Sequence, residues 1–160
     1  MNHDLSRRDL LKGLASAAAP FQANTVNRKW TPEASIAIMD KYGTESAIMS
    51  MTIAAEYLCT GTEKARGFTR DCNEYGAKLA QTNKRFGFLA SIPAREIDAS
   101  LKEIEYSFDT LKADGLGLFS NTGDKWWGDP VFTPIFDELN RRSAAVERRK
   151  NRQNAKRRFL

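Results

Sequence analysis

Apolar residues follow two patterns along this chain of 160 residues. Repeats of three and four positions predict amphipathic helices, and these fall at 32–42, 63–84, 97–111 and 132–139. Short runs that are apolar throughout predict buried strands, and these fall at 46–52, 86–92 and 115–120. Strands that alternate with helices of this length pair in parallel through right-handed crossovers. The pattern therefore predicts an α/β fold with about three parallel strands and covering helices.

Capping residues support the predicted helix boundaries. Thr31 and Pro32 make a typical first turn, and Gly43 can end the same helix. Asp129 and Pro130 repeat that start before the last helix. The apolar stripes expected to face the core contain Ile36, Met39 and Tyr42 in the first helix; Ala65, Phe68, Cys72, Tyr75 and Leu79 in the second; Ile97, Leu101, Ile104, Phe108 and Leu111 in the third; and Phe132, Ile135, Phe136 and Leu139 in the fourth.

The strand count leaves two architectures open, a small open sheet or part of a (β/α)8 barrel. A closed barrel needs eight βα units and typically about 250 residues, and this chain supplies about three and a half units. Periodicity alone does not decide between the two.

The net charge of +5 belongs to one end of the chain. Residues 141–160 hold nine Lys and Arg and one acidic residue, Glu147, which leaves sixteen basic and nineteen acidic residues, net −3, in residues 1–140. Dense blocks of like charge usually stay solvated. We therefore expect residues 147–160 to form a basic, disordered tail.

The first residues are similar to a twin-arginine export signal, Ser6-Arg7-Arg8-Asp9-Leu10-Leu11-Lys12, with small-residue cleavage sites before residue 20. A plain amphipathic helix is the alternative. We expect segment 1–24 to direct export to the periplasm, and the protein to stay cytoplasmic if the signal is not functional. No apolar run approaches the roughly 18 residues that a membrane-spanning helix requires.

Residues for metal or nucleophilic chemistry are scarce. Metal-assisted hydrolysis needs imidazole or carboxylate ligands around an open position, but the only histidine is His3, inside the signal-like segment. Cys59 and Cys72 lie thirteen positions apart without a CxxC pairing, which is too little for a zinc site or a disulfide scaffold. The sequence therefore predicts no catalytic residue and no metal ligand.

Two further features have ordinary structural interpretations. Gly115 and Gly117 lack the third glycine of a dinucleotide-binding fingerprint, so close packing at a strand start is favoured. Glu103 and Glu105 lie on a helix whose opposite face is apolar, so we expect both carboxylates to be solvated.

The loop at residues 120–129 is the best candidate for contact with a ligand. It follows a predicted strand, and ligands gather at the carboxyl ends of strands in parallel α/β folds. Asn121, Lys125, Trp126 and Trp127 could wall a substrate pocket there, or the two tryptophans could form a packing lid over the next helix. The segments after the other strands would open on the same rim. The candidates for substrate contact are Asn121, Lys125 and Trp126.

Several motifs in order and spacing resemble one family over residues 30–146. They are Trp30-Thr-Pro-Glu, Arg66…Asn73-Glu-Tyr, Arg85-Phe-Gly-Phe, the run from Glu103 to Gly115, and Lys125-Trp-Trp-Gly-Asp-Pro…Phe136-Asp-Glu-Leu-Asn-Arg-Arg142. The family is that of the amidohydrolase-related proteins, closest to aminocarboxymuconate-semialdehyde decarboxylase. The resemblance implies a (β/α)8 TIM barrel that uses a divalent metal, often zinc, to decarboxylate or hydrolyse a small organic acid.

The chain departs from the family pattern twice. The resemblance implies a first strand with a His-x-His pair, and there is no room for it before Trp30. It also implies a strand after Arg142 that ends in a metal-binding histidine, but here Ser143–Val146 leads into an arginine-rich run. We therefore expect a truncated or frameshifted fragment in which residues 30–146 form a partial barrel that retains none of the family's metal ligands.

The resulting hypothesis is a fragment of a metal-dependent hydrolase or carboxy-lyase that is inactive alone. The alternative is a non-catalytic α/β module whose basic tail binds nucleic acid or an acidic partner, although the tail has only Phe159 for base stacking. Nucleic acid is not the expected partner. An oligomer, or complementation by the missing barrel segments, stays open.

Overall fold

The computed structural model describes residues 30–51 and 62–149. The export-like segment 1–24, His3, Cys59 and tail residues 150–160 lie outside these ranges. The helices and strands in chain order are α2 (Pro32–Lys41), β1 (Ala47–Ser50), α4 (Thr62–Thr82), β2 (Phe86–Ala90), α5 (Ile97–Glu105), the π-helix η1 (Tyr106–Thr110), β3 (Gly115–Phe119), β4 (Asn121–Thr122), β5 (Lys125–Trp126), the 3-10 helix η2 (Pro130–Phe132), α6 (Thr133–Arg141) and β6 (Val146–Arg149). Among these, no helix has the length and apolar character needed to cross a bilayer.

The main sheet has four parallel strands in the order β1-β2-β3-β6. The predicted α/β class and parallel pairing are confirmed, with one strand more than the three expected. That strand, β6, begins at Val146 and runs to Arg149, three residues into the segment expected to be a disordered tail. Pairing with β3 uses backbone groups, so the exposed side chains of Glu147 and Arg148 do not prevent it.

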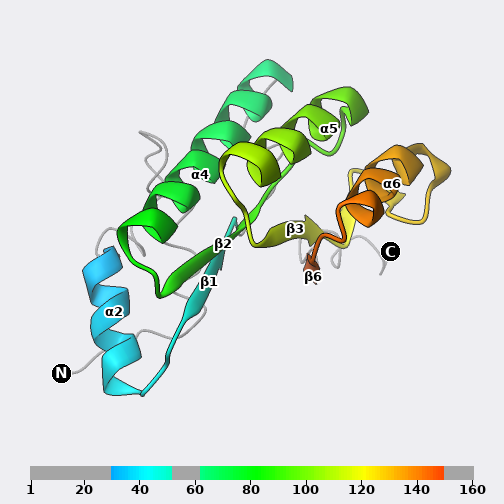
Figure 1. The fold of residues 1–160 in the computed structure, drawn as a ribbon. Coiled ribbons are helices and arrows are strands. Elements are labelled where there is room, and N and C mark those ends of the chain that lie inside the picture. The colour runs from blue at the N-terminus through cyan, green and yellow to red at the C-terminus, as the bar shows by residue number, and fades with distance from the viewer. Residues whose placement is uncertain (1–29, 52–61, 150–160) are drawn as a thin grey trace, which may run out of the picture.

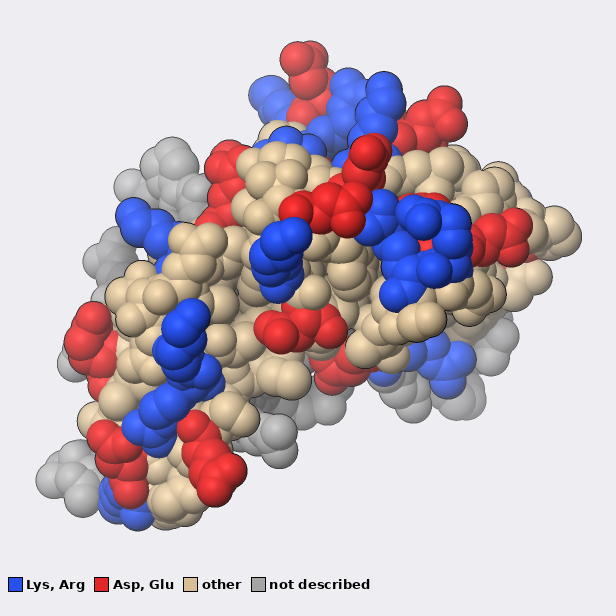
Figure 2. All heavy atoms as spheres, viewed as in Figure 1, with Lys and Arg blue, Asp and Glu red and all other residues tan. Residues whose placement is uncertain are grey.

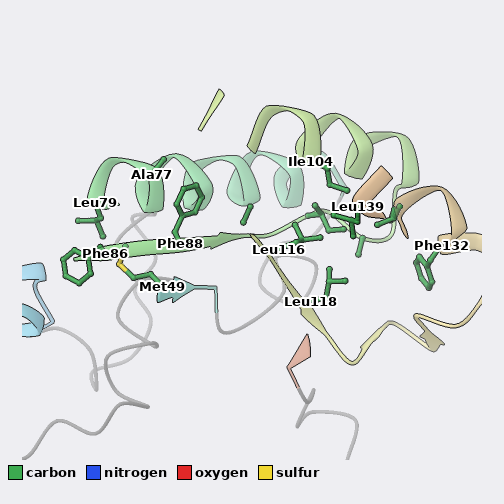
Figure 3. Close-up of a cluster of buried hydrophobic side chains, with 14 of the residues drawn as sticks. Met49, Ala77, Leu79, Phe86, Phe88, Ile104, Leu116, Leu118, Phe132 and Leu139 are labelled. Atoms are coloured by element: carbon green, nitrogen blue, oxygen red, sulfur yellow. The ribbon is translucent and has the colours of Figure 1, made fainter. Parts of the chain in front are cut away.

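Helices α4, α5 and α6 lie on one side of the sheet (Figure 1). Met49, Phe88, Leu116 and Leu118 alternate along their strands so that they share the helix-covered face. They form one buried cluster with residues of the three helices, among them Ala77, Leu79, Ile104, Ile135 and Leu139 (Figure 3). The apolar stripes of the second, third and fourth helices therefore locate much of the core.

The first helix forms as its capping residues predict. The hydroxyl of Thr31 accepts a hydrogen bond from the Ala34 N–H at 3.1 Å, and Gly43 follows the helix with φ of 63°. The expected apolar stripe is wrong at Tyr42, which is 57% exposed. Ser35 is buried on this helix because the indole Nε1 of Trp30 donates to its hydroxyl at 2.8 Å.

Gly115 confirms the prediction of close packing at a strand start. A Cβ at this position would lie 2.7 Å from the Ala145 carbonyl oxygen and 2.9 Å from Leu89 Cδ2. Gly117 does not share this constraint, since its nearest neighbour, Leu89 Cβ, would be 3.6 Å away. Only the first glycine is therefore required by the approach of β6 to β3.

Candidate functional site

The carboxyl ends of β1, β2 and β3 meet at one end of the sheet because the strands are parallel. A pocket opens at this end, and we call it the rim pocket. Its lining is mostly apolar, with Ser91 and Thr122 as polar members: Met51, Ser91, Ile92, Ala94, Gly117, Leu118, Phe119, Thr122 and Trp127. An apolar hollow with a few polar groups is the usual form of a small-molecule site.

Asn73 of α4 holds the chain where it leaves β2. Its Nδ2 donates to the Ser91 carbonyl at 2.9 Å, and its Oδ1 accepts from the Ser91 N–H at 2.9 Å. Asn73 is 3% exposed. The side-chain amide therefore pairs with the backbone as a neighbouring strand would, and it satisfies groups that would otherwise be buried unpaired.

Glu103 of α5 completes this arrangement. Its carboxylate accepts from Asn73 Nδ2 at 2.8 Å, and from Arg70 through Nη2 at 2.8 Å and Nε at 2.9 Å. The guanidinium of Arg70 also lies over the Tyr106 ring, 3.7 Å from its centre. These contacts offset the desolvation of a buried carboxylate. The hydrogen bond to Glu103 in turn raises the pKa of Arg70.

The expectation that Glu103 and Glu105 are both solvated is wrong for Glu103. Glu103 is 5% exposed, whereas Glu105 is exposed. The partners that stabilise Glu103 come from a different helix, 30 and 33 residues earlier in the chain. The periodicity of α5 alone carries no information about them. The sequence feature that could have indicated this pairing is Asn73, a polar residue next to the apolar stripe of α4.

The segment after β3 folds back on itself. β4 and β5 pair antiparallel, with Asn121 opposite Trp126, and Gly123 in the turn has φ of 59°. The Asn121 side chain is buried and its Nδ2 donates to the Gly123 carbonyl at 2.8 Å. Lys125 Nζ donates to Asp129 Oδ2 at 2.7 Å, which raises the pKa of Lys125 and lowers the pKa of Asp129.

The two tryptophans of this segment have different environments. Trp126 is 54% exposed. Trp127 packs its ring against Phe132 at 4.6 Å and Phe136 at 5.9 Å between centroids, and its Nε1 donates to the Phe119 carbonyl. Trp127 also lines the rim pocket. Trp127 therefore packs over the next helices and also lines this pocket, whereas contact with a substrate stays a prediction.

The three substrate-contact candidates come together on one hairpin. Asn121, Lys125 and Trp126 all belong to β4 and β5, but none of them is among the residues that line the rim pocket. The pocket walls instead include Ser91, Thr122 and Trp127. Substrate contact by the three candidates stays a prediction.

A divalent metal does not fit the described residues. Within residues 30–51 and 62–149, no group of three or more His, Cys, Asp or Glu is placed to hold a metal ion. Cys72 is half-buried and packs against Ala65 and Met51. Any metal site would need groups from outside these ranges.

Several charged side chains on the helices form ion pairs. Figure 2 shows acidic and basic groups next to one another over the helical layer. Arg66 with Glu96, at 3.1 Å, and Arg142 with Asp109, at 2.6 Å, are two of these ion pairs. On the face that Figure 2 shows, the described residues form no extended basic surface of the kind that binds nucleic acid.

Comparison with characterised proteins gives consistent matches. No protein-family profile matches the chain. The decarboxylase macB of Penicillium terrestre is 37% identical over 124 residues, 74% of this chain and 37% of macB. The 6-methylsalicylic acid decarboxylase of Penicillium expansum is 36% identical over 73% of this chain and 37% of its own length. The 2-amino-3-carboxymuconate-6-semialdehyde decarboxylase of Dictyostelium discoideum is 25% identical over 73% of this chain and 33% of its length. The chain thus spans about a third of the relatives it matches.

Solved structures agree on the fold. The 5-carboxyvanillate decarboxylase from Sphingomonas paucimobilis superposes with a TM-score of 0.66 at 25% identity, over 71% of this chain and 34% of that one. The enzyme of the same name from Novosphingobium aromaticivorans, solved with bound manganese, gives 0.66 at 24% identity over 71% and 33%. These neighbours have the amidohydrolase TIM-barrel fold, so the open choice between a small sheet and a barrel segment is decided for the barrel.

Proposed function

This chain is a relative of the amidohydrolase-fold decarboxylases, and we propose that its described body forms one wall of a decarboxylase substrate pocket without supplying the metal ligands. The observation that carries the proposal is the rim pocket itself. It lies at the carboxyl ends of the strands, where barrel enzymes place their active sites, and no metal-binding cluster accompanies it in residues 30–51 and 62–149.

The proposed substrate class is a small aromatic carboxylic acid. Ile92, Phe119 and Trp127 offer apolar surface to a ring, and aromatic rings pack favourably against such side chains. The name of the Penicillium expansum relative, 6-methylsalicylic acid decarboxylase, supports an acid of this kind. Carboxy-lyase chemistry is therefore favoured over the hydrolase alternative.

We further propose that the isolated chain is inactive. The divalent metal, zinc or manganese, would be held by groups that residues 30–51 and 62–149 lack. In the described sheet, β1 and β6 are the two edges, and an open strand edge is a template for another strand. We propose that further barrel strands pair at these edges, and the test below supplies them as a second polypeptide.

The test uses the full chain with 6-methylsalicylic acid and Mn²⁺ or Zn²⁺. We expect no decarboxylation and no stoichiometric metal in the purified protein by elemental analysis. Adding the Penicillium expansum relative with its matched segment deleted should restore turnover, and the intact relative is the positive control. Turnover or stoichiometric metal in the chain alone would contradict the proposal.

Export is a separate proposal that rests on segment 1–24, outside the described residues. The supporting feature is the pair Arg7-Arg8 in its export-signal context. We expect processed protein in the periplasm and retention of an Arg7→Lys, Arg8→Lys variant in the cytoplasm. Cell fractionation with N-terminal sequencing provides the measurement, and an intact N-terminus on periplasmic protein would contradict cleavage.

A further inference from the structure

We infer that Asn73 and Ser100 are positioning residues that fix the β2 side of the rim pocket from the helical layer. The wall in question is residues 91–94, three of which line the pocket. The inference rests on the proposed function only in calling this pocket a substrate site. The geometry that carries it is independent of any activity.

The first contact acts at the start of the wall. Both backbone groups of Ser91 are bonded to the single side chain of Asn73. Nδ2 of the same amide is held by Glu103 Oε1 at 2.8 Å. Asn73 is therefore bonded both to Ser91 and to Glu103. The positions of α4 and α5 thus determine the position of Ser91, the first residue after β2.

The second contact acts two residues later. Ser100 of α5 is fully buried, and its hydroxyl donates to the Pro93 carbonyl at 3.0 Å. That carbonyl also accepts from the Glu96 N–H at 2.9 Å, which forms the turn into α5. The Glu96 side chain is bound in turn by Arg66 of α4 at 3.1 Å.

The wall therefore has bonds to two helices over a short stretch of chain. Buried polar groups that are fully paired hold a single geometry, since every alternative leaves a donor or acceptor unsatisfied. The hydrogen bonds that hold this path come from side chains of the chain itself. The β2 side of the pocket is preformed, as a site with high precision requires.

Amide exchange in the full chain, followed residue by residue by NMR, tests the inference. Asn73→Ala should accelerate exchange at the Ser91 amide about tenfold or more, the effect of losing a buried hydrogen bond. The Leu116 amide, bonded to Ala145 O in β3, should change far less. A purely structural role would accelerate both equally, because global unfolding exposes all amides together.

Two other variants keep the test decisive. Ser100→Ala removes one hydroxyl, and it should accelerate the Glu96 amide while leaving Leu116 unchanged. Thr82→Ala is the matched control, because Thr82 makes the same kind of bond to Lys78 O at 2.8 Å at an exposed helix end. It should leave Ser91 and Glu96 unchanged. If Asn73→Ala does not fold, Ser100→Ala decides the question.

The inference is overturned if Ser91 and Leu116 accelerate equally in Asn73→Ala, or if Glu96 is unaffected in Ser100→Ala. Failure of a reconstituted enzyme to act on 6-methylsalicylic acid would count against the proposed function alone. The exchange rates would still report on the positioning of the wall, so the two ideas fail separately.

Discussion

The segments that follow β2 and β3, the β2 exit and the β3 exit, lie at the same end of the sheet but are held by different kinds of contact. The β2 exit is bound by side chains of α4 and α5 from up to 18 residues away, through Asn73 and Ser100. The β3 exit is held by contacts that are close in sequence: the β4–β5 pairing, the bonds of Asn121 and Lys125 over two to four residues, and the packing of Trp127 on the next helices. One wall of the rim pocket depends on the helical layer, and the other depends on local sequence.

This difference has a consequence for stability. The contacts of the β2 exit include a buried charge, Glu103, whose pairing joins α4 to α5. At the β3 exit the charged contact is the Lys125–Asp129 ion pair, which is exposed, so water screens it. Damage to the first should spread through the fold, whereas damage to the second should be limited.

The largest effect is expected from Glu103→Gln. Removing the charge leaves Arg70 without its carboxylate partner, and breaking a buried pair from one side is strongly destabilising. The guanidinium side chain is 38% exposed, so we expect about 3 kcal/mol, the lower end of that range. Urea unfolding measures the loss.

Glu105→Gln is the matched control, two residues along the same helix and exposed. It should change the free energy of unfolding by less than about 0.5 kcal/mol. Equal effects of the two substitutions would show that the buried pairing of Glu103 adds no stability beyond that of an exposed carboxylate on the same helix.

The next effect is expected from Trp127→Ala. The ring loses its contacts with Phe132 and Phe136, and we expect about 2 kcal/mol, since the side chain is only partly buried. Trp126→Ala, at the neighbouring exposed position, should cost less than about 0.5 kcal/mol. Thermal unfolding of the two variants gives the comparison. A larger loss of stability in Trp126→Ala than in Trp127→Ala would contradict the conclusion that Trp127 packs over the helices and Trp126 lies at the surface.

The sequence predicted the β3 exit better than the β2 exit for a physical reason. Turn residues, a cap and a proline act on near neighbours, so the loop, Asp129 and Pro130 could be located from the sequence. Glu103 was misassigned because its partners come from another helix. Helical periodicity describes one element at a time, and it cannot show which polar residue a second element will bury.

The same limit explains why the sequence predicted one strand too few. It also explains why the sequence did not show that the three substrate-contact candidates lie outside the lining of the rim pocket. β6 carries polar residues and pairs through its backbone, so apolar runs could not indicate its length. Asn121, Lys125 and Trp126 lie on the two strands of one hairpin. The direction in which each side chain points depends on the hairpin register, which the spacing of polar residues does not give.

The smallest effect is a pH dependence on the β3 side of the molecule. Glu138 of α6 accepts hydrogen bonds from Arg141 and Arg142, which lower the pKa of its carboxyl group to about 2. The ordinary value is 4.5. Because the pKa is depressed by folding, the stabilisation is fully present above about pH 4.5. It is lost as the pH falls from there through about 2.

The expected loss over this window is about 1 kcal/mol, because exposed ion pairs are screened by water and salt. Urea midpoints at pH 5, 4 and 3 should fall more steeply for the unaltered protein than for Glu138→Gln. An unchanged slope in Glu138→Gln would assign the acid sensitivity to other carboxylates.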